Sequence, residues 1–199
     1  MMHRVLRDSC FGHSPKLIFD IKNVNFYAAD YNGAKSFSKK KSLVFNLTKE
    51  PHKSNIYSIL ELHSCLDYSF DEIVMGWEDG DIPAVKPQFW TKFLNYVAYK
   101  DYSDVCTHCL MGHGRTGTTM AALLVVAKAV SAEEAIITIR DKYCKKAVET
   151  DRQIKYVFEI DEFANQRPMP EEISVIGSSF SMKDSSRDID GYIIKDHFE

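Results

Sequence analysis

The residues most capable of chemistry lie between His108 and Gly117, in the stretch His-Cys-Leu-Met-Gly-His-Gly-Arg-Thr-Gly. Cys109 and Arg115 stand six positions apart, with two glycines between them. Glycines let the backbone turn so that successive N–H groups point inward and cradle an anion. A planar guanidinium holds two phosphate oxygens at once, and a thiol beside cations at a helix start loses its proton readily. The stretch predicts a loop that binds a phosphate and attacks it with a thiolate.

Each residue of this stretch has an expected role. Cys109 would attack phosphorus and form a phosphocysteine, and Arg115 would bind the phosphate and stabilise the transition state. Thr116 would place its hydroxyl against the leaving thiolate, and His108 would order the loop from beneath by hydrogen bonding. The other substrate-binding positions are Leu110, Met111, Gly112, His113 and Gly114. The alternative is a plain glycine-rich turn with a buried cysteine and a surface arginine.

Cys106 and Cys109 also match a C-x-x-C pattern, which occurs in zinc and redox sites. No second pair accompanies them at zinc-ribbon spacing, and on a strand the two side chains point to opposite faces. Cys106 is therefore interpreted as a core residue, with a redox role as the alternative. The chain has five cysteines, and this odd number argues against a disulfide framework.

The pattern H-C-x-x-G-x-x-R-[S/T]-G resembles the signature of the protein tyrosine and dual-specificity phosphatases, and residues 108–117 match every fixed position. The resemblance runs from about Ile18 to Ala164. It implies the compact dual-specificity type, because the chain is short and shows no tyrosine-recognition loop of the larger members. The implied chemistry needs neither a metal nor another cofactor.

The segment from Trp77 to Pro83 resembles the mobile acid loop of that family. The spacing of Trp, Asp and Pro puts Asp79 in the position of the general acid, which protonates the leaving oxygen. Asp81 stands where the family usually has Gly, so we expect it to face solvent. A role for Asp81 as a second acid and a merely solvated acidic turn remain alternatives.

The segment from Val148 to Gln153 resembles the later glutamine loop of the family, in the E-T-x-x-Q form. Gln153 would then position the water that hydrolyses the phosphocysteine. Thr150 and Gln153 also have the spacing of an ordinary helix capping box. The two interpretations are compatible, and both stay open.

The surrounding sequence predicts an α/β fold in which helices flank a central, mostly parallel sheet. Strands are expected within 17–31, 42–48, 55–62, 69–77 and 104–109, with a loop over 31–42. Helices are expected from Pro87 onward and over 118–130, 131–144 and 151–164, and Ser131 and Glu134 suit a capping box. In such sheets ligands bind at the carboxyl ends of the strands, where the 108–117 loop begins.

Residues 1–166 are expected to form one phosphatase domain, and 167–199 an acidic, serine-rich tail, either flexible or packed as short edge elements. The formal net charge is −3, which does not suit a general nucleic-acid binder. No apolar run is long enough to insert into a membrane. We therefore expect a soluble, cytoplasmic protein, and the sequence leaves its oligomeric state open.

The expected function is hydrolysis of phosphate monoesters, with a phosphorylated protein as substrate. The alternatives are a non-protein substrate, such as a phosphoinositide or an RNA 5′-triphosphate, and a non-catalytic phosphopeptide-binding module. Apolar Leu110 and Met111 argue against a highly charged inositol phosphate, since lipid-phosphatase relatives tend to have lysines there. His113 could carry a proton and keeps that option open. The run Lys39–Lys41 could support it too, or could simply be a solvated loop.

Overall fold

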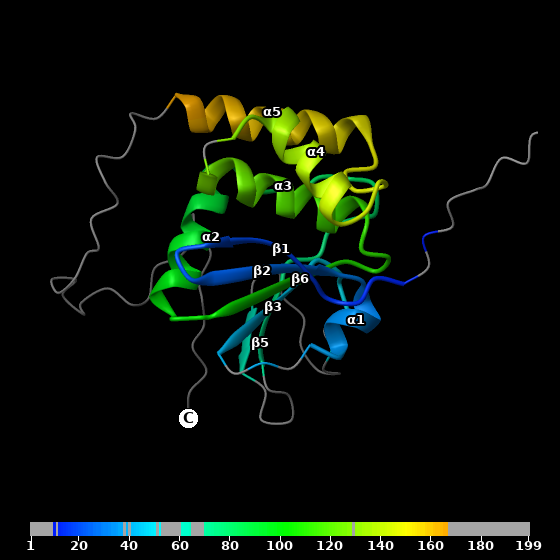
Figure 1. Ribbon diagram of the computed structural model, residues 1–199, viewed down its shortest axis with the longest axis vertical. Helices are drawn as coiled ribbons and strands as arrows, with labels where there is room; N and C mark the ends of the chain where they lie inside the picture. Colours follow the sequence, from blue (N-terminus) through cyan, green and yellow to red (C-terminus); the bar gives the residue numbers. More distant parts are fainter. Residues whose placement is uncertain are drawn as a thin grey trace, which may run out of the picture.

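A six-stranded sheet with the order β1-β2-β6-β3-β5-β4 forms the centre of the molecule (Figure 1). The computed structural model describes Cys10, residues 12–37, Lys39, 41–50, His52, 61–64, 70–128 and 130–166. The strands are β1 (Lys16–Ile21), β2 (Val24–Ala29), β3 (Ser42–Asn46), β4 (Glu61–Ser64), β5 (Phe70–Val74) and β6 (Asp104–His108). The predicted tail 167–199 and most of the strand predicted at 55–62 lie outside the described residues.

The four inner strands run parallel, and the two outer ones are antiparallel to their neighbours. β2 pairs with β6, β6 with β3 and β3 with β5 in parallel, whereas β1 and β4 close the edges in antiparallel pairs. Every residue of β3 and β6 is buried, as in parallel strands that are covered on both faces. The prediction of a mostly parallel central sheet is confirmed.

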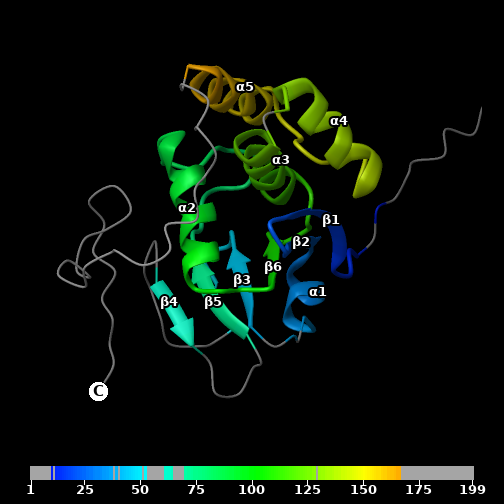
Figure 2. The same ribbon diagram turned by 60° about the vertical axis from the view of Figure 1, so that its left-hand side comes forward.

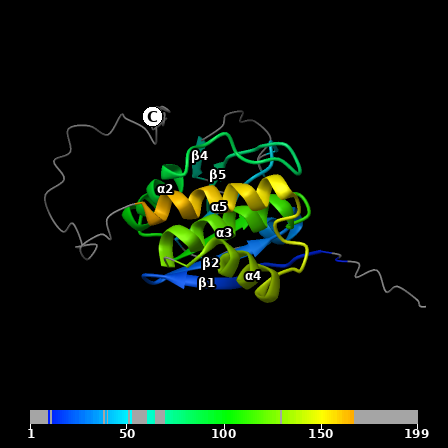
Figure 3. The ribbon, with the colours of Figure 1, turned by 90° about the horizontal axis from the view of Figure 1, so that it is seen from above.

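The two faces of the sheet carry very different numbers of helices (Figures 2 and 3). The main core joins one face to α2 (Gln88–Tyr99), α3 (Gly114–Lys128), α4 (Ala132–Lys142) and α5 (Asp151–Asn165). A small core of Ala29, Ala34, Phe37, Val44 and Cys106 lies under α1 (Tyr31–Lys35) on the other face. Within the described part of the chain, no helix is long and apolar enough to cross a bilayer.

The helices predicted from the sequence are confirmed, and so are both capping boxes. Ser131 and Glu134 cap α4 reciprocally, and Thr150 and Gln153 do the same for α5. The predicted loop over 31–42 is wrong for its first part, because α1 forms there. Its start is set by Asp30, whose carboxylate accepts a hydrogen bond of 2.7 Å from the Gly33 N–H.

Candidate active site

The candidate site lies at the carboxyl ends of β6, β3 and β5. Cys109 follows β6 directly, Leu47 follows β3, and Trp77 comes shortly after β5. Because these strands are parallel neighbours, their ends converge on one edge of the sheet. Cys109 is only 2% exposed and stands between the end of β6 and the start of α3, as the strand–loop–helix pattern predicts.

The loop after Cys109 needs its glycines because other segments press against it. Gly112 has φ +78°, and a Cβ there would lie 2.5 Å from Tyr143 Oη and 2.9 Å from Ala29 O. A Cβ on Gly114 would lie 2.5 Å from Glu149 Oε2 and 2.9 Å from Gln153 Oε1. The loop is therefore packed between the end of β2 and the segment that joins α4 to α5.

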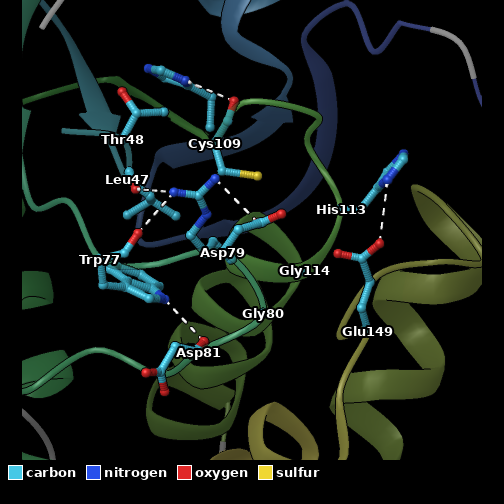
Figure 4. Close-up of polar contacts among 12 residues, drawn as sticks. Leu47, Thr48, Trp77, Asp79, Gly80, Asp81, Cys109, His113, Gly114 and Glu149 are labelled. Atoms are coloured by element: carbon cyan, nitrogen blue, oxygen red, sulfur yellow. Dashed lines mark hydrogen bonds and ion pairs between the residues drawn. The ribbon is translucent and has the colours of Figure 1, made fainter. Parts of the chain in front are cut away.

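Arg115 is buried, and its guanidinium is fixed by the backbone carbonyls of Leu47 and Trp77, both labelled in Figure 4. Nη1 donates to Trp77 O at 2.9 Å and to Leu47 O at 3.3 Å. Nη2 forms an ion pair of 3.2 Å with Asp79 Oδ1. Nε is buried and has no hydrogen-bond partner among the described residues. The alternative of a surface arginine in a plain turn is excluded.

The structure brings Asp79, and not Asp81, to this arginine. The Asp79 side chain is 77% exposed apart from its contact with Arg115. Asp81 is turned elsewhere, because Oδ1 pairs with Arg152 Nη1 at 2.7 Å and accepts a 2.7 Å hydrogen bond from the Ile82 N–H. Asp81 thus faces solvent only in part: its side chain is 35% exposed, and a basic residue of α5 pairs with it.

Hydrogen bonds connect the candidate acid loop, residues 77–83, to the N-cap of α5 and to the tryptophan of the loop itself. Trp77 Nε1 donates to Asp81 O at 3.1 Å, and Thr150 Oγ1 donates to Gly80 O at 2.9 Å. These bonds hold the backbone on the C-terminal side of Asp79. The Asp79 carboxylate itself pairs with Arg115.

Gln153 lies between the pocket loop and the acid loop. Its side chain is fully buried, with Oε1 accepting from the Glu149 N–H at 2.9 Å and Nε2 donating to Asp81 O at 3.2 Å. The capping box with Thr150 is formed as well, so the capping interpretation is confirmed. Contact with Gly114 places the amide beside the pocket loop, and its action on water remains a prediction.

His108 lies beneath the loop, as expected, and has a neighbour that the sequence did not indicate. His108 Nδ1 is 3.3 Å from Cys109 O, and Nε2 is 3.1 Å from Nε2 of His52. Burial lowers the pKa of His108 from 6.5 to about 3, and the nearby His52 contributes to this shift. Burial also lowers the pKa of His52, to about 4. Both imidazoles are neutral at pH 7.

The remaining loop residues divide between the surface and the interior. Leu110 and Met111 are 58% and 52% exposed, so they lie at the rim. Thr116 Oγ1 is buried and has no hydrogen-bond partner among the described residues, which leaves it available for the expected role. His113 is buried, with Nε2 2.9 Å from His13 Nε2 and Nδ1 3.6 Å from Glu149 Oε1.

Lys39 and Lys41, the described residues of the lysine run, lie at the end of the sheet opposite to the candidate site. Lys39 pairs with Asp104 at 3.0 Å, and Lys41 pairs with Asp101. Asp104 opens β6, so these lysines lie at the amino ends of the parallel strands. Lys40 is outside the described residues. Of the described residues of the run, neither contributes to the candidate site.

Cys106 is a core residue, as interpreted, and is separated from Cys109 by the sheet. Cys106 belongs to the small core under α1, whereas Cys109 belongs to the main core. Burial raises the pKa of the Cys106 thiol strongly. A thiol held neutral on the opposite face is a poor redox partner for Cys109.

Two groups of side chains have the composition of metal sites, and the sequence predicted neither. One consists of Cys10, His13, His113 and Cys144, and the other of His52, Glu72 and His108. Within each group the ligand atoms lie no more than 4.8 Å apart. The second group is occupied by its own hydrogen bonds, since Glu72 accepts from Asn46 and from the His52 N–H.

Fold and site together define an α/β domain in which a thiol and a buried arginine lie between the end of β6 and the first turn of α3. The family model for the protein-tyrosine phosphatases matches residues 31–160, which is more than half of the chain. The chain therefore belongs to the protein-tyrosine phosphatase family, as the motif predicted.

Solved structures of this family share the fold. The active form of Tk-PTP has a TM-score of 0.54 at 22% identity, covering 75% of this chain and 97% of that one. PTPMT1 has a TM-score of 0.55 at 15% identity, with coverage of 76% and 96%. Kinase-associated phosphatase, with its catalytic-site cysteine replaced by serine, has 0.52 at 14%, with coverage of 79% and 99%.

Two curated relatives come from Methanocaldococcus jannaschii, both of them uncharacterised proteins. They are 37% and 34% identical to this chain over 83 and 84 residues, or 41% of its length in each case. The matched part is 50% of one relative and 54% of the other. The chain thus matches about half the length of each relative.

The neutral pair His52 and His108 predicts a fold that loses stability in acid. Their folded pKa values, about 4 and about 3, lie below the ordinary 6.5, so the unfolded chain takes up protons first as pH falls. The free energy of unfolding should fall from pH 6.5 toward 4, by up to about 1.4 kcal/mol per pH unit for each histidine. Urea denaturation across this pH range measures the slope.

The matched variant is His52→Asn, which removes one imidazole and its repulsion of a proton on His108. It should make the pH slope shallower, whatever it does to stability at pH 7. A slope as steep as that of the wild type would contradict the assignment of these two histidines.

Proposed function

We propose that this chain hydrolyses phosphate monoesters on phosphorylated proteins through a phosphocysteine on Cys109. The proposal is carried by the convergence of Cys109, Arg115 and Asp79 at one edge of the sheet. Arg115 Nη2 and Asp79 Oδ1 are 3.2 Å apart, and the buried Nε of Arg115 has no acceptor among the described residues. A bound phosphate supplies that acceptor.

In the first step the phosphate binds to the backbone N–H groups of the loop and to Arg115. The Cys109 thiolate attacks phosphorus, an S–P bond forms, and the bond from phosphorus to the leaving oxygen breaks. Asp79, as the neutral acid, gives its proton to that oxygen, so the product leaves as an alcohol or phenol. The exposed position of Asp79 suits contact with a large substrate.

In the second step water attacks the phosphocysteine. Asp79, now a carboxylate, takes a proton from the water, the S–P bond breaks and the thiolate leaves with inorganic phosphate as the product. The hydroxyl of Thr116, for which the described part of the chain offers no hydrogen-bond partner, stabilises the departing thiolate by a hydrogen bond. Gln153, whose amide lies beside Gly114, orients the water.

The rim of the loop favours a protein substrate. Leu110 and Met111 present exposed apolar side chains where a highly charged ligand would need cations. Lys39 and Lys41 lie at the far end of the sheet and pair with acidic residues there. A phosphopeptide buries apolar surface against this rim around a single phosphate.

A phosphoinositide is the second candidate, because a similar structure is PTPMT1 in complex with PI(5)P, with a TM-score of 0.51 at 14% identity. A substrate panel decides between the two. It compares kcat/KM for phosphotyrosine, phosphoserine and phosphothreonine peptides, phosphoinositides and RNA 5′-triphosphate. We expect a phosphopeptide to give the highest value, and a higher value for PI(5)P or RNA would overturn the protein assignment.

The nucleophile is tested by Cys109→Ser, which should abolish turnover of p-nitrophenyl phosphate while leaving peptide binding measurable. Rapid quenching of the wild type with a radiolabelled phosphopeptide should trap label on Cys109, because the intermediate is covalent. Turnover by Cys109→Ser at the wild-type rate would rule out this mechanism. A wild type that binds phosphopeptide tightly and never turns it over would instead identify a binding module.

The acid is tested by the matched pair Asp79→Asn and Asp81→Asn. Asp79→Asn should lower kcat on a peptide phosphate by about 10²–10⁴-fold, the usual contribution of general acid catalysis. The loss should shrink for p-nitrophenyl phosphate, whose leaving group needs little protonation. Asp81→Asn should change kcat only several-fold, through its contact with Arg152. The assignment would be falsified by the larger, leaving-group-dependent loss appearing in Asp81→Asn.

A further inference from the structure

We propose that Cys10, His13, His113 and Cys144 form a tetrahedral zinc site that ties the pocket loop to the N-terminal segment and to the end of α4. Two thiols and two imidazoles are a donor set that structural zinc sites use. The residues come from three segments that are far apart in the sequence. Cys10 and His13 precede β1, His113 precedes α3, and Cys144 follows α4.

The ligand atoms lie close enough together to bind one zinc ion after small shifts. Zinc bonds of about 2.3 Å to sulfur and 2.0–2.1 Å to nitrogen put the ligand atoms of a tetrahedron roughly 3.3–3.8 Å apart. Here Cys10 Sγ is 3.2 Å from Cys144 Sγ and 3.3 Å from His13 Nε2. His13 Nε2 is 2.9 Å from His113 Nε2, and every pair lies within 4.8 Å.

The surroundings orient both imidazoles. Glu149 Oε1 lies 3.6 Å from His113 Nδ1, the ring nitrogen that does not contact His13, and Figure 4 shows the Glu149 carboxylate pointing toward this ring. A carboxylate on the second nitrogen is the usual partner of a zinc-bound histidine. The His13 backbone is held by Asp30, which accepts its N–H at 2.6 Å, and the His13 ring packs on Tyr143 with centroids 4.8 Å apart.

The charges also balance at this place. Two thiolates and two neutral imidazoles around Zn²⁺ carry no net charge, so the group suits a site whose members are buried or half-buried. A disulfide between Cys10 and Cys144 is the rival arrangement, since their sulfurs are in contact. A disulfide would involve only two of the four residues, whereas one metal ion engages all four.

The site lies outside the reacting groups and adds no step to the chemistry. His113 belongs to the loop between Cys109 and Arg115, and its imidazole turns outward to His13 and Glu149. Zinc bound there would fix the loop from its outer side. The proposal does not rest on the proposed function, since an inactive Cys109→Ser protein keeps all four ligands.

The test measures the zinc content of the full chain purified under reducing conditions, by mass spectrometry of the metal. We expect one zinc per chain in the wild type, in Cys109→Ser and in the matched control Cys106→Ser, which alters a cysteine of the other core. Cys10→Ser and Cys144→Ser should weaken zinc binding by more than about 100-fold, since even residues that only hydrogen-bond to a metal ligand contribute about 10–100-fold. Zinc retained in full by both thiol variants would overturn the proposal.

A second measurement covers the case in which these variants do not fold. Wild type and Cys109→Ser, stripped of metal, are titrated with Co²⁺, which should give the visible bands of a tetrahedral thiolate complex in both. Zinc a hundredfold above its Kd should raise Tm on the order of 5–10 °C. The absence of a cobalt spectrum together with no rise in Tm would rule out the zinc site. So would a chain that, purified under reducing conditions, still weighs two hydrogens less than the all-thiol form, because that mass indicates a disulfide.

Discussion

A buried guanidinium sets the geometry of this molecule. Arginine keeps its charge inside a protein and brings five N–H donors that need acceptors. Arg115 directs Nη1 to the carbonyls of Leu47 and Trp77, which follow β3 and β5. Those carbonyls meet the arginine only because β6, β3 and β5 are parallel neighbours. The strand order therefore determines where the arginine can be held.

The same constraint explains why the site has an open donor. With Nη1 on the two carbonyls and Nη2 on Asp79, Nε remains buried without a partner among the described residues. A buried donor left unpaired costs about 1–3 kcal/mol, and a charged one costs more. An anion that accepted a hydrogen bond from Nε would remove this cost, and the energy so recovered would contribute to its binding.

Two neutral histidines hold the loop from beneath by hydrogen bonds and add no charge to the candidate site. Cys109 O can only accept, so His108 Nδ1 must carry the proton and donate to it. The neutral ring then accepts at Nε2, which makes His52 the donor there. A second proton on His108 would break this chain of hydrogen bonds, and burial keeps its pKa too low for that near pH 7.

The sequence predicted those parts of the molecule that depend on neighbours along the chain. The spacing from His108 to Gly117 identified the loop, and the capping boxes at Ser131 and Thr150 located two helices, because such patterns act over a single turn. The missed parts depend on contacts made by the fold. The pairing of Asp81 with Arg152 could not be predicted because Arg152 lies on another element. The contact of His52 with His108 likewise follows no local sequence pattern.

The four-residue cluster shows the same limit most clearly and suggests what it does for the loop. Cys10 and Cys144 are 134 positions apart in the sequence, so no local pattern pairs them. In the folded chain they meet the loop at His113, two residues before Arg115. Carbonyls at two strand ends hold the inner side, and a metal would hold the outer side. A loop fixed on both sides presents its N–H groups to the transition state without having to reorganise, which is the condition for strong electrostatic catalysis.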